Sequence, residues 1–259
     1  MSKVATLTSL SIFNTTQSAY EPQLAAIDIS KNVNLETIIL GGNTYQKGKI
    51  TELDVTNNTK LTQISAENNK ISKIIGLPAS LKNLYVSNNE LADITFPEFT
   101  VKGTIQIQNN KFTLGTLPKK PAITSNSKYT YAPQPAYQVA ETLGVLDLTS
   151  QLTATGILEA PVQTTFSFVT ASGAALVEGT DYAAIEPGKF AFIKEQSEKV
   201  HAVMASEAFP KFTGNNAYVT SEFTVDAAAG LASVNGILTQ KEPERLLTRC
   251  GKCSALSRP

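Results

Sequence analysis

The chain has 259 residues, of which 42% are hydrophobic and 17% are charged, and its 22 basic and 22 acidic side chains give a formal net charge of zero. This composition supports a packed core and excludes a chain that is disordered throughout. The balanced charge offers no electrostatic attraction for nucleic acid, so we expect no nucleic-acid partner. No apolar run reaches the roughly 20 residues of a transmembrane helix, so we expect no membrane insertion.

Residue types that catalyse reactions or bind metals are scarce. The chain has one histidine, His201, and two cysteines, Cys250 and Cys253. The cysteine pair has no second pair or histidine nearby, as a zinc site would need, and its role stays open. His201 lies in an alternating run that places it on the surface of a strand. We therefore expect no metal, no cofactor and no enzymatic activity.

A repeated pattern begins at Leu24 and ends at Phe112. Its template is L-x-x-L-x-L-x-x-N, the signature of leucine-rich repeats. The asparagines that end the units are Asn32, Asn43, Asn58, Asn69, Asn89 and Asn110. A side-chain amide at this position can bond backbone groups where the chain leaves a sheet. We therefore predict a structural asparagine ladder.

The middle apolar residues of the units form two interleaved series. The first is Ile27, Leu53, Ile74 and Ile94, with steps of 26, 21 and 20 residues. The second is Ile38, Ile64, Leu84 and Ile105, with steps of 26, 20 and 21. One insertion near residues 44–49 explains the long first step of both series. The period predicts a solenoid of nested 21-residue repeats whose leucines share one core, including Leu35, Leu53, Leu61, Leu84 and Ile105.

The pattern changes along the chain and predicts a mainly β fold in four parts. Residues 1–117 form the solenoid, and residues 118–144 are a proline-containing linker. Residues 145–226 contain short runs rich in β-branched and aromatic residues, separated by glycines. Such runs are typical of an antiparallel sandwich, here called Ig-like. Residues 227–259 show no strand pattern and are expected to be a disordered tail.

The repeats resemble the internalin-J-like leucine-rich repeat proteins of bacterial surfaces. Units of the type Leu-Asp-x-Ser-x-Asn, at 27–32 and 53–58, alternate with units that end in paired asparagines, at 64–69 and 84–89. Some relatives carry a cysteine ladder at the second apolar position of the latter units. In this chain that position holds Leu40, Ala66, Val86 and Ile107.

The linker and the expected sandwich resemble the arrangement in surface proteins of Bacteroidetes. Together the two resemblances imply a protein that is secreted or held at a bacterial cell surface. The first residues show no apolar segment of a signal peptide. This start is compatible with a mature or truncated form.

The outward positions of the repeat strands form the candidate binding face. The residues that we select on it are Ile39, Ser65, Glu67, Tyr85 and Gln106. Tyr85 lies between two core positions and is expected to project to solvent as an interface anchor.

The resemblance implies adhesion or recognition, with a protein of another cell or of the host matrix, or a glycan, as the partner. A carbohydrate-binding or enzyme-accessory module is the alternative function, and a plain solvated sheet is the alternative reading of the face. The sequence does not indicate the ligand, the face that binds it or the oligomeric state.

Overall fold

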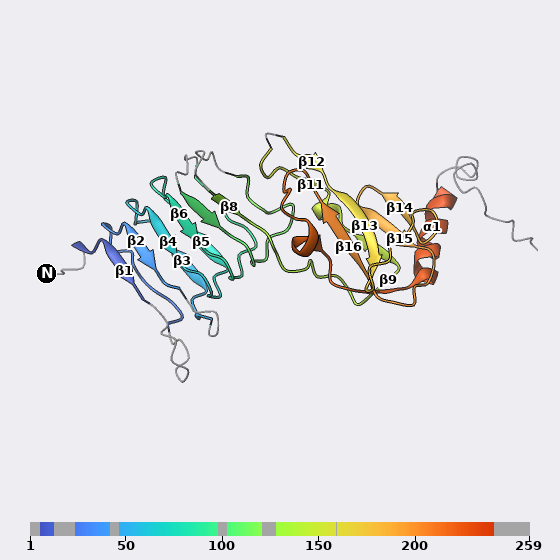
Figure 1. Ribbon diagram of the computed structural model, residues 1–259, viewed down its shortest axis with the longest axis horizontal. Helices are drawn as coiled ribbons and strands as arrows, with labels where there is room; N and C mark the ends of the chain where they lie inside the picture. Colours follow the sequence, from blue (N-terminus) through green and yellow to red (C-terminus); the bar gives the residue numbers. More distant parts are fainter. Residues whose placement is uncertain are drawn as a thin grey trace, which may run out of the picture. The chain divides into compact units, whose positions relative to one another are not determined.

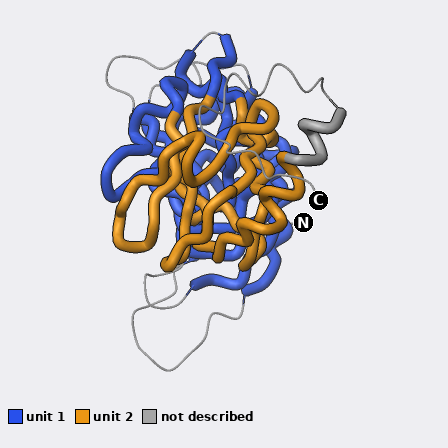
Figure 2. The backbone as a smooth tube through the Cα atoms, turned by 90° about the vertical axis from the view of Figure 1, so that its right-hand side faces the viewer, with its two compact units in different colours: residues 1–135, 153–163, 206–218 blue, residues 136–152, 164–205, 219–259 orange. Residues whose placement is uncertain are grey.

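The computed structural model describes residues 6–12, 24–41, 47–97, 103–120, 128–158 and 160–240, with side chains up to residue 234. The chain divides into two compact units, coloured in Figure 2. The first unit comprises residues 1–135, 153–163 and 206–218, and the second comprises residues 136–152, 164–205 and 219–259. The units are therefore not contiguous in sequence, and the expected sandwich, 145–226, contributes to both.

Short parallel strands build the first unit. Six of them form one sheet in the order β1 (Ser9–Ser11), β2 (Thr37–Ile39), β4 (Gln63–Ser65), β6 (Asn83–Tyr85), β7 (Thr104–Gln106) and β8 (Lys128–Thr130). Figure 1 shows these strands stacked coil upon coil. A second sheet pairs β3 (Glu52–Asp54) with β5 (Lys73–Ile75). The sheets correspond to the two apolar series, so the leucine-rich-repeat solenoid is confirmed.

The register of the main sheet aligns equivalent residues of successive coils. Ile38 pairs with Ile64, Ile64 with Leu84, and Leu84 with Ile105. The five residues predicted to share the core are each at most 1% exposed. This alignment follows from the repeat, because one short strand cannot bury its own leucine but a stack of them can.

The expected linker contains the last coil of the solenoid. Strand β8 pairs with β7, and Tyr129 occupies the position opposite Ile105 that an aliphatic residue fills in the other coils. Tyr129 is 5% exposed, and its hydroxyl donates to the Pro118 carbonyl at 2.8 Å. The prolines around this coil obscured it in the sequence, because their density suggested an extended connector.

Two segments from much later in the chain belong to this same unit. Strand β11 (Thr153–Ala154) pairs antiparallel with β12 (Val162–Gln163), and residues 206–218 include the 3-10 helix η3 (Gly214–Asn216). The Tyr131 ring of the last coil contacts Phe209 and Phe212, with centroids 5.1 and 5.3 Å away. The last coil therefore buries its aromatic side chains against residues about 80 positions further along the chain.

The second unit is built from small sheets around an aromatic core. One sheet has the order β10 (Val145–Asp147), β15 (Lys189–Phe192) and β14 (Tyr182–Glu186), and another has β13 (Thr165–Thr170), β16 (Val200–Ala205) and β17 (Tyr218–Val219). Strand β9 (Thr142–Leu143) pairs with β18 (Thr224–Val225), and the 3-10 helix η2 spans Thr149–Gln151. The Phe168 ring contacts Phe190 and Phe192 edge-on, with centroids 4.9 and 5.3 Å away.

The helix α1 (Ala227–Gln240) corrects the expectation of a tail that is disordered from residue 227. The side chain of Asp226 accepts the Ala229 amide at 3.0 Å and caps the helix. Gly230 lies against the Phe192 carbonyl. Residues 241–259, with Cys250 and Cys253, lie outside the described part of the chain. Among the described residues, no helix combines the length and the apolar character needed to cross a bilayer.

Candidate functional site

The main sheet places four of the selected residues in one row. Ile39 pairs with Ser65, Ser65 with Tyr85, and Tyr85 with Gln106. Neighbouring strands lie about 4.8 Å apart, so these side chains are adjacent on the outer side of the sheet. Thr130 on β8 extends the row beyond the repeats that the sequence suggested. One ligand can therefore touch side chains from several coils.

Burial along this row is uneven. Ser65 is only 9% exposed, and its hydroxyl accepts the Gln63 side-chain amide at 3.2 Å. Its short side chain lies between the larger Ile39 and Tyr85, which are both half-buried. Tyr85 thus occupies an outward position, as its place in the repeat predicts, but only part of it reaches solvent. Ser65 offers little surface to a ligand, which leaves Ile39, Tyr85 and Gln106 as the accessible members.

A second row of residues lies two positions after the last residue of each strand, and it contains Glu67. Its members are Gly41, Glu67, Ser87 and Gln108. Glu67 is half-buried, and a Cβ placed on Gly41 would lie 3.9 Å from Glu67 Oε2, so the carboxylate reaches the surface beside the glycine. Burial raises the pKa of Glu67, and the residue's own backbone amide offsets only part of this effect. Glu67 is the acidic side chain of the candidate face.

The asparagine ladder is held by hydrogen bonds to the backbone. The side-chain amide of Asn89 donates to the carbonyls of Ala66 and Val86 at 2.9 and 3.1 Å, and its oxygen accepts the Ile71 amide at 3.0 Å. Asn58, Asn69 and Asn110 donate to backbone carbonyls in a similar way. Asn32 is buried, and Asn43 lies outside the described residues. The side-chain amide groups of Asn58, Asn69, Asn89 and Asn110 are therefore engaged inside the solenoid.

The ladder has two features that the sequence did not predict: a left-handed backbone at three asparagines and a glutamine that continues the ladder. Asn68, Asn88 and Asn109, the first members of the paired asparagines, have positive φ angles of 56–58°. Asparagine tolerates this left-handed conformation better than other side chains do. Gln134 continues the ladder after Asn110, since its side chain donates to the Ile107 carbonyl at 3.0 Å and accepts the Asn110 amide at 2.9 Å. Its place 24 residues after Asn110 could have revealed it.

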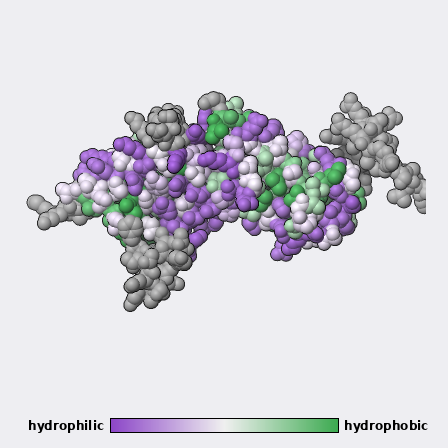
Figure 3. Space-filling view, in the orientation of Figure 1, coloured by the Kyte–Doolittle hydropathy of each residue, from purple (hydrophilic) through white to green (hydrophobic). Residues whose placement is uncertain are grey.

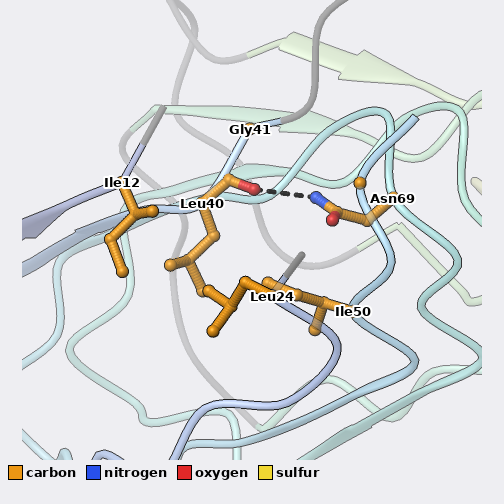
Figure 4. Close-up of a pocket in the computed structure, with 7 residues that line it drawn as sticks. Ile12, Leu24, Leu40, Gly41, Ile50 and Asn69 are labelled. Atoms are coloured by element: carbon orange, nitrogen blue, oxygen red, sulfur yellow. Dashed lines mark hydrogen bonds between the residues drawn. The ribbon is translucent and has the colours of Figure 1, made fainter. Parts of the chain in front are cut away.

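A small, partly open pocket lies near the end of strand β2 in the described part of the repeat unit. Figure 4 shows the residues around it, which are Ile12, Leu24, Leu40, Gly41, Ile50 and Asn69, together with the unlabelled Gly48. The Asn69 amide donates to the Leu40 carbonyl at 2.8 Å across its edge. Its volume of about 20 Å³ is room for a single water molecule. The candidate site is therefore the open face of the sheet.

The surface of the repeat unit that faces the viewer in Figure 3 is mainly hydrophilic. This matches the residues of the candidate face, where amide and hydroxyl side chains predominate over Ile39 and Tyr85. Such a surface is closer to a transient protein interface than to an obligate one, which would be more apolar.

His201 lies on β16 in the second unit, in a different sheet from the residues of the candidate face. It is half-buried opposite Val169, and its Nδ1 has no hydrogen-bond partner among the described residues. Within the described chain, no hydrogen bond or ion pair joins it to a carboxylate or to a nucleophile.

Comparison with known proteins adds a structural likeness. No family model and no curated protein matches the chain. A solved structure to which the chain is similar is the functional domain of InlJ from Listeria monocytogenes, described as including a cysteine ladder. The two are 18% identical, with a TM-score of 0.40 over 78% of this chain. The aligned part spans 46% of that structure's chain.

Proposed function

We propose that the chain is a non-catalytic adhesion or recognition protein that binds a protein partner through the outer face of the β1–β8 sheet. The observation that carries the proposal is the register of Ile39, Tyr85 and Gln106, which brings one apolar, one aromatic and one amide side chain into a single row. A half-buried tyrosine offers a rigid apolar body with a hydroxyl, the profile of an interface anchor.

The repeat motifs support a place at a bacterial surface or in secreted form, because of their resemblance to internalin-J-like proteins. In this proposal the partner is a protein of another cell or of the host matrix. The second unit, which we propose to be Ig-like, acts as a spacer. The chain needs no cofactor for this role.

The test uses two double variants of the full chain. Tyr85→Ala with Gln106→Ala removes the anchor row, and Glu52→Ala with Lys73→Ala alters exposed, paired positions of the β3–β5 sheet. We expect adhesion to cells or immobilised matrix proteins to fall at least about fivefold for the first variant only, a cost of about 1 kcal/mol that only a minority of interface residues exceed. Unchanged adhesion by a folded first variant would exclude this face.

A glycan partner is the alternative, favoured by the amide side chains of Gln63, Asn83 and Gln106 on the face. Such groups bond sugar hydroxyls, but among the described residues of the face Tyr85 alone is an aromatic stacking platform. A glycan array separates the two candidates. Binding of a defined glycan that is lost with Tyr85→Ala would replace the protein partner in the proposal.

A further inference from the structure

Glu67 is the carboxylate of the candidate face, and it forms no ion pair with a described residue. The ion pairs between Lys111 and Glu90, between Lys189 and both Asp147 and Glu186, and between Lys194 and Asp181 do not involve it. Residues 42–46, which follow Gly41 directly, contain no lysine, arginine or histidine. Lys47 and Lys49 come next in the chain, and neither is joined to Glu67 by an ion pair in the described part of the structure.

On the two neighbouring coils, the positions equivalent to Glu67 carry no charge. The equivalent positions of the neighbouring coils are Gly41 and Ser87. Ser87 is 5% exposed and Gly41 has no side chain, so neither shields the carboxylate from above. Among the described residues, Glu67 Oε2 is the atom that a Cβ placed on Gly41 would meet, at 3.9 Å. A group carried by another molecule can reach the carboxylate there.

A half-buried carboxylate without a partner is unfavourable for the fold. Burial favours its neutral form, as the raised pKa shows. A glutamine would fill nearly the same volume without the desolvation of a charge. The solenoid itself gains nothing from an acid at this position, whereas an interface with a positively charged partner does, because the charges are complementary there.

We propose that Glu67 selects a partner protein with a basic residue, and that its carboxylate binds a lysine or arginine side chain of that partner next to Gly41. This inference rests on the proposed function. It adds the chemistry of the partner: a protein segment with a basic residue that meets Glu67 while neighbouring residues contact Tyr85. An arginine suits the site best, because its guanidinium can bond both carboxylate oxygens.

Random peptides displayed on phage and selected on the full chain test the inference. Peptides that bind the candidate face are recognised by their loss of binding to the Tyr85→Ala, Gln106→Ala variant. We expect them to be enriched in lysine or arginine. Their affinity should fall about tenfold for Glu67→Gln, the effect of one charge-assisted contact, and stay unchanged for Glu52→Gln, a matched loss of charge on the β3–β5 sheet.

Two further variants sharpen the result. Gly41→Lys supplies an internal cation next to Glu67, whose Oε2 lies 3.9 Å from a Cβ placed on Gly41, and the φ of Gly41 is not in the left-handed region. It should weaken the selected peptides as much as Glu67→Gln does. Replacing the peptide's arginine by citrulline, which is neutral and similar in shape, should have the same effect.

The outcomes separate this inference from the proposed function. Peptides that require Tyr85 and Gln106 but bind Glu67→Gln equally well overturn the inference and leave the proposed face intact. Peptides that require neither the anchor row nor Glu67 contradict both. Thermal unfolding of each variant shows that it is folded before its binding is compared.

Discussion

Single residues of the repeat divide between those that serve the fold and those that face solvent. Asn89 is 6% exposed, with its amide shared among backbone carbonyls of two coils. Asp28 and Asp54 accept hydrogen bonds from the side chains and the backbone amides of Ser30 and Thr56, the amides at 2.9 Å, and these bonds lower the pKa of both carboxyls. These acids close turns, whereas the Glu67 carboxylate accepts a hydrogen bond from its own backbone amide.

The first prediction concerns Asn89→Ala. The substitution leaves the buried Ile71 amide without its partner, while the Ala66 and Val86 carbonyls keep the side-chain amides of Asn69 and Asn110. One buried polar group without a partner costs about 1–3 kcal/mol. We expect a loss of that size in the free energy of unfolding, measured by urea denaturation. Asn57→Ala, at a solvent-exposed turn position without a positive φ, should cost less, and equal losses would contradict the ladder's role.

The second prediction is a pH dependence at Glu67. Below its ordinary pKa of 4.5 the carboxyl is protonated in both the folded and the unfolded chain. As pH rises, the Glu67 carboxyl ionises first in the unfolded chain, because burial has raised its pKa in the folded state. The wild type therefore loses stability as the pH rises from the unfolded-state pKa through the folded-state pKa. Glu67→Gln removes this loss. The variant should therefore gain stability relative to the wild type between about pH 4 and pH 7.

Urea midpoints of the two proteins, measured at pH 3.5 and at pH 7, check this expectation. Glu52→Gln serves as the control, because its carboxylate is exposed on β3. A wild type that is more stable than Glu67→Gln at pH 7 would show that Glu67 has a stabilising partner, contrary to the further inference.

At the scale of elements, helix α1 shows how contact with a sheet overrides local preference. Gly230 is a poor helix former, and a helix of this length would ordinarily gain about 1 kcal/mol from alanine there. In this fold a Cβ on Gly230 would clash with the Phe192 carbonyl oxygen. The glycine is required because the helix backbone approaches β15 closely.

The third prediction follows from that contact. Gly230→Ala should destabilise the second unit by about 1–3 kcal/mol, the usual cost of overpacking, because the helix must move away from β15. Hydrogen exchange of the α1 amides and thermal unfolding measure the effect. Ala228→Gly, at an exposed position of the same helix, isolates the intrinsic helix preference. A Gly230→Ala variant more stable than the wild type would mean that α1 does not dock on β15.

At the scale of the whole molecule, the repeat unit depends on sequence that lies outside the repeats. Tyr218 donates its hydroxyl to the Phe112 carbonyl at 3.3 Å, and the Lys211 amide donates to the Tyr131 hydroxyl at 2.8 Å. Phe209, which contacts the Tyr131 ring, is 1% exposed. Segments 153–163 and 206–218 thus supply the core that a further repeat would otherwise provide, as terminal caps of solenoids do.

The fourth prediction tests this closure with Phe209→Ala. The cavity beside Tyr131 should cost about 3–5 kcal/mol, and the loss should appear in the last coil. Hydrogen exchange at the amides of Ile107 and Tyr131 reports on it. Phe190→Ala, in the core of the second unit, is the control and should leave those amides protected. Unchanged exchange in Phe209→Ala would show that the last coil is stable without the cap.

The sequence by itself determined the solenoid, its two strand series and the register of the candidate row. This was possible because the partner of Leu84 in the core is the equivalent residue of the next coil, so a periodic pattern carries the tertiary contact within it. The same periodicity located Ile39, Tyr85 and Gln106 on the outward side of the strands.

Only the tertiary structure decided where the repeat unit ends and how much of its face is accessible. Tyr131 and Phe209 are 78 residues apart, and no local pattern links them, so the cap and the coil at β8 could not be read from periodicity. The burial of Ser65 depends on the size of its neighbours across the sheet. The docking of α1 on β15 depends on the close approach of Gly230 to the Phe192 carbonyl. These contacts arise between segments whose sequences do not repeat, and packing alone brings them together.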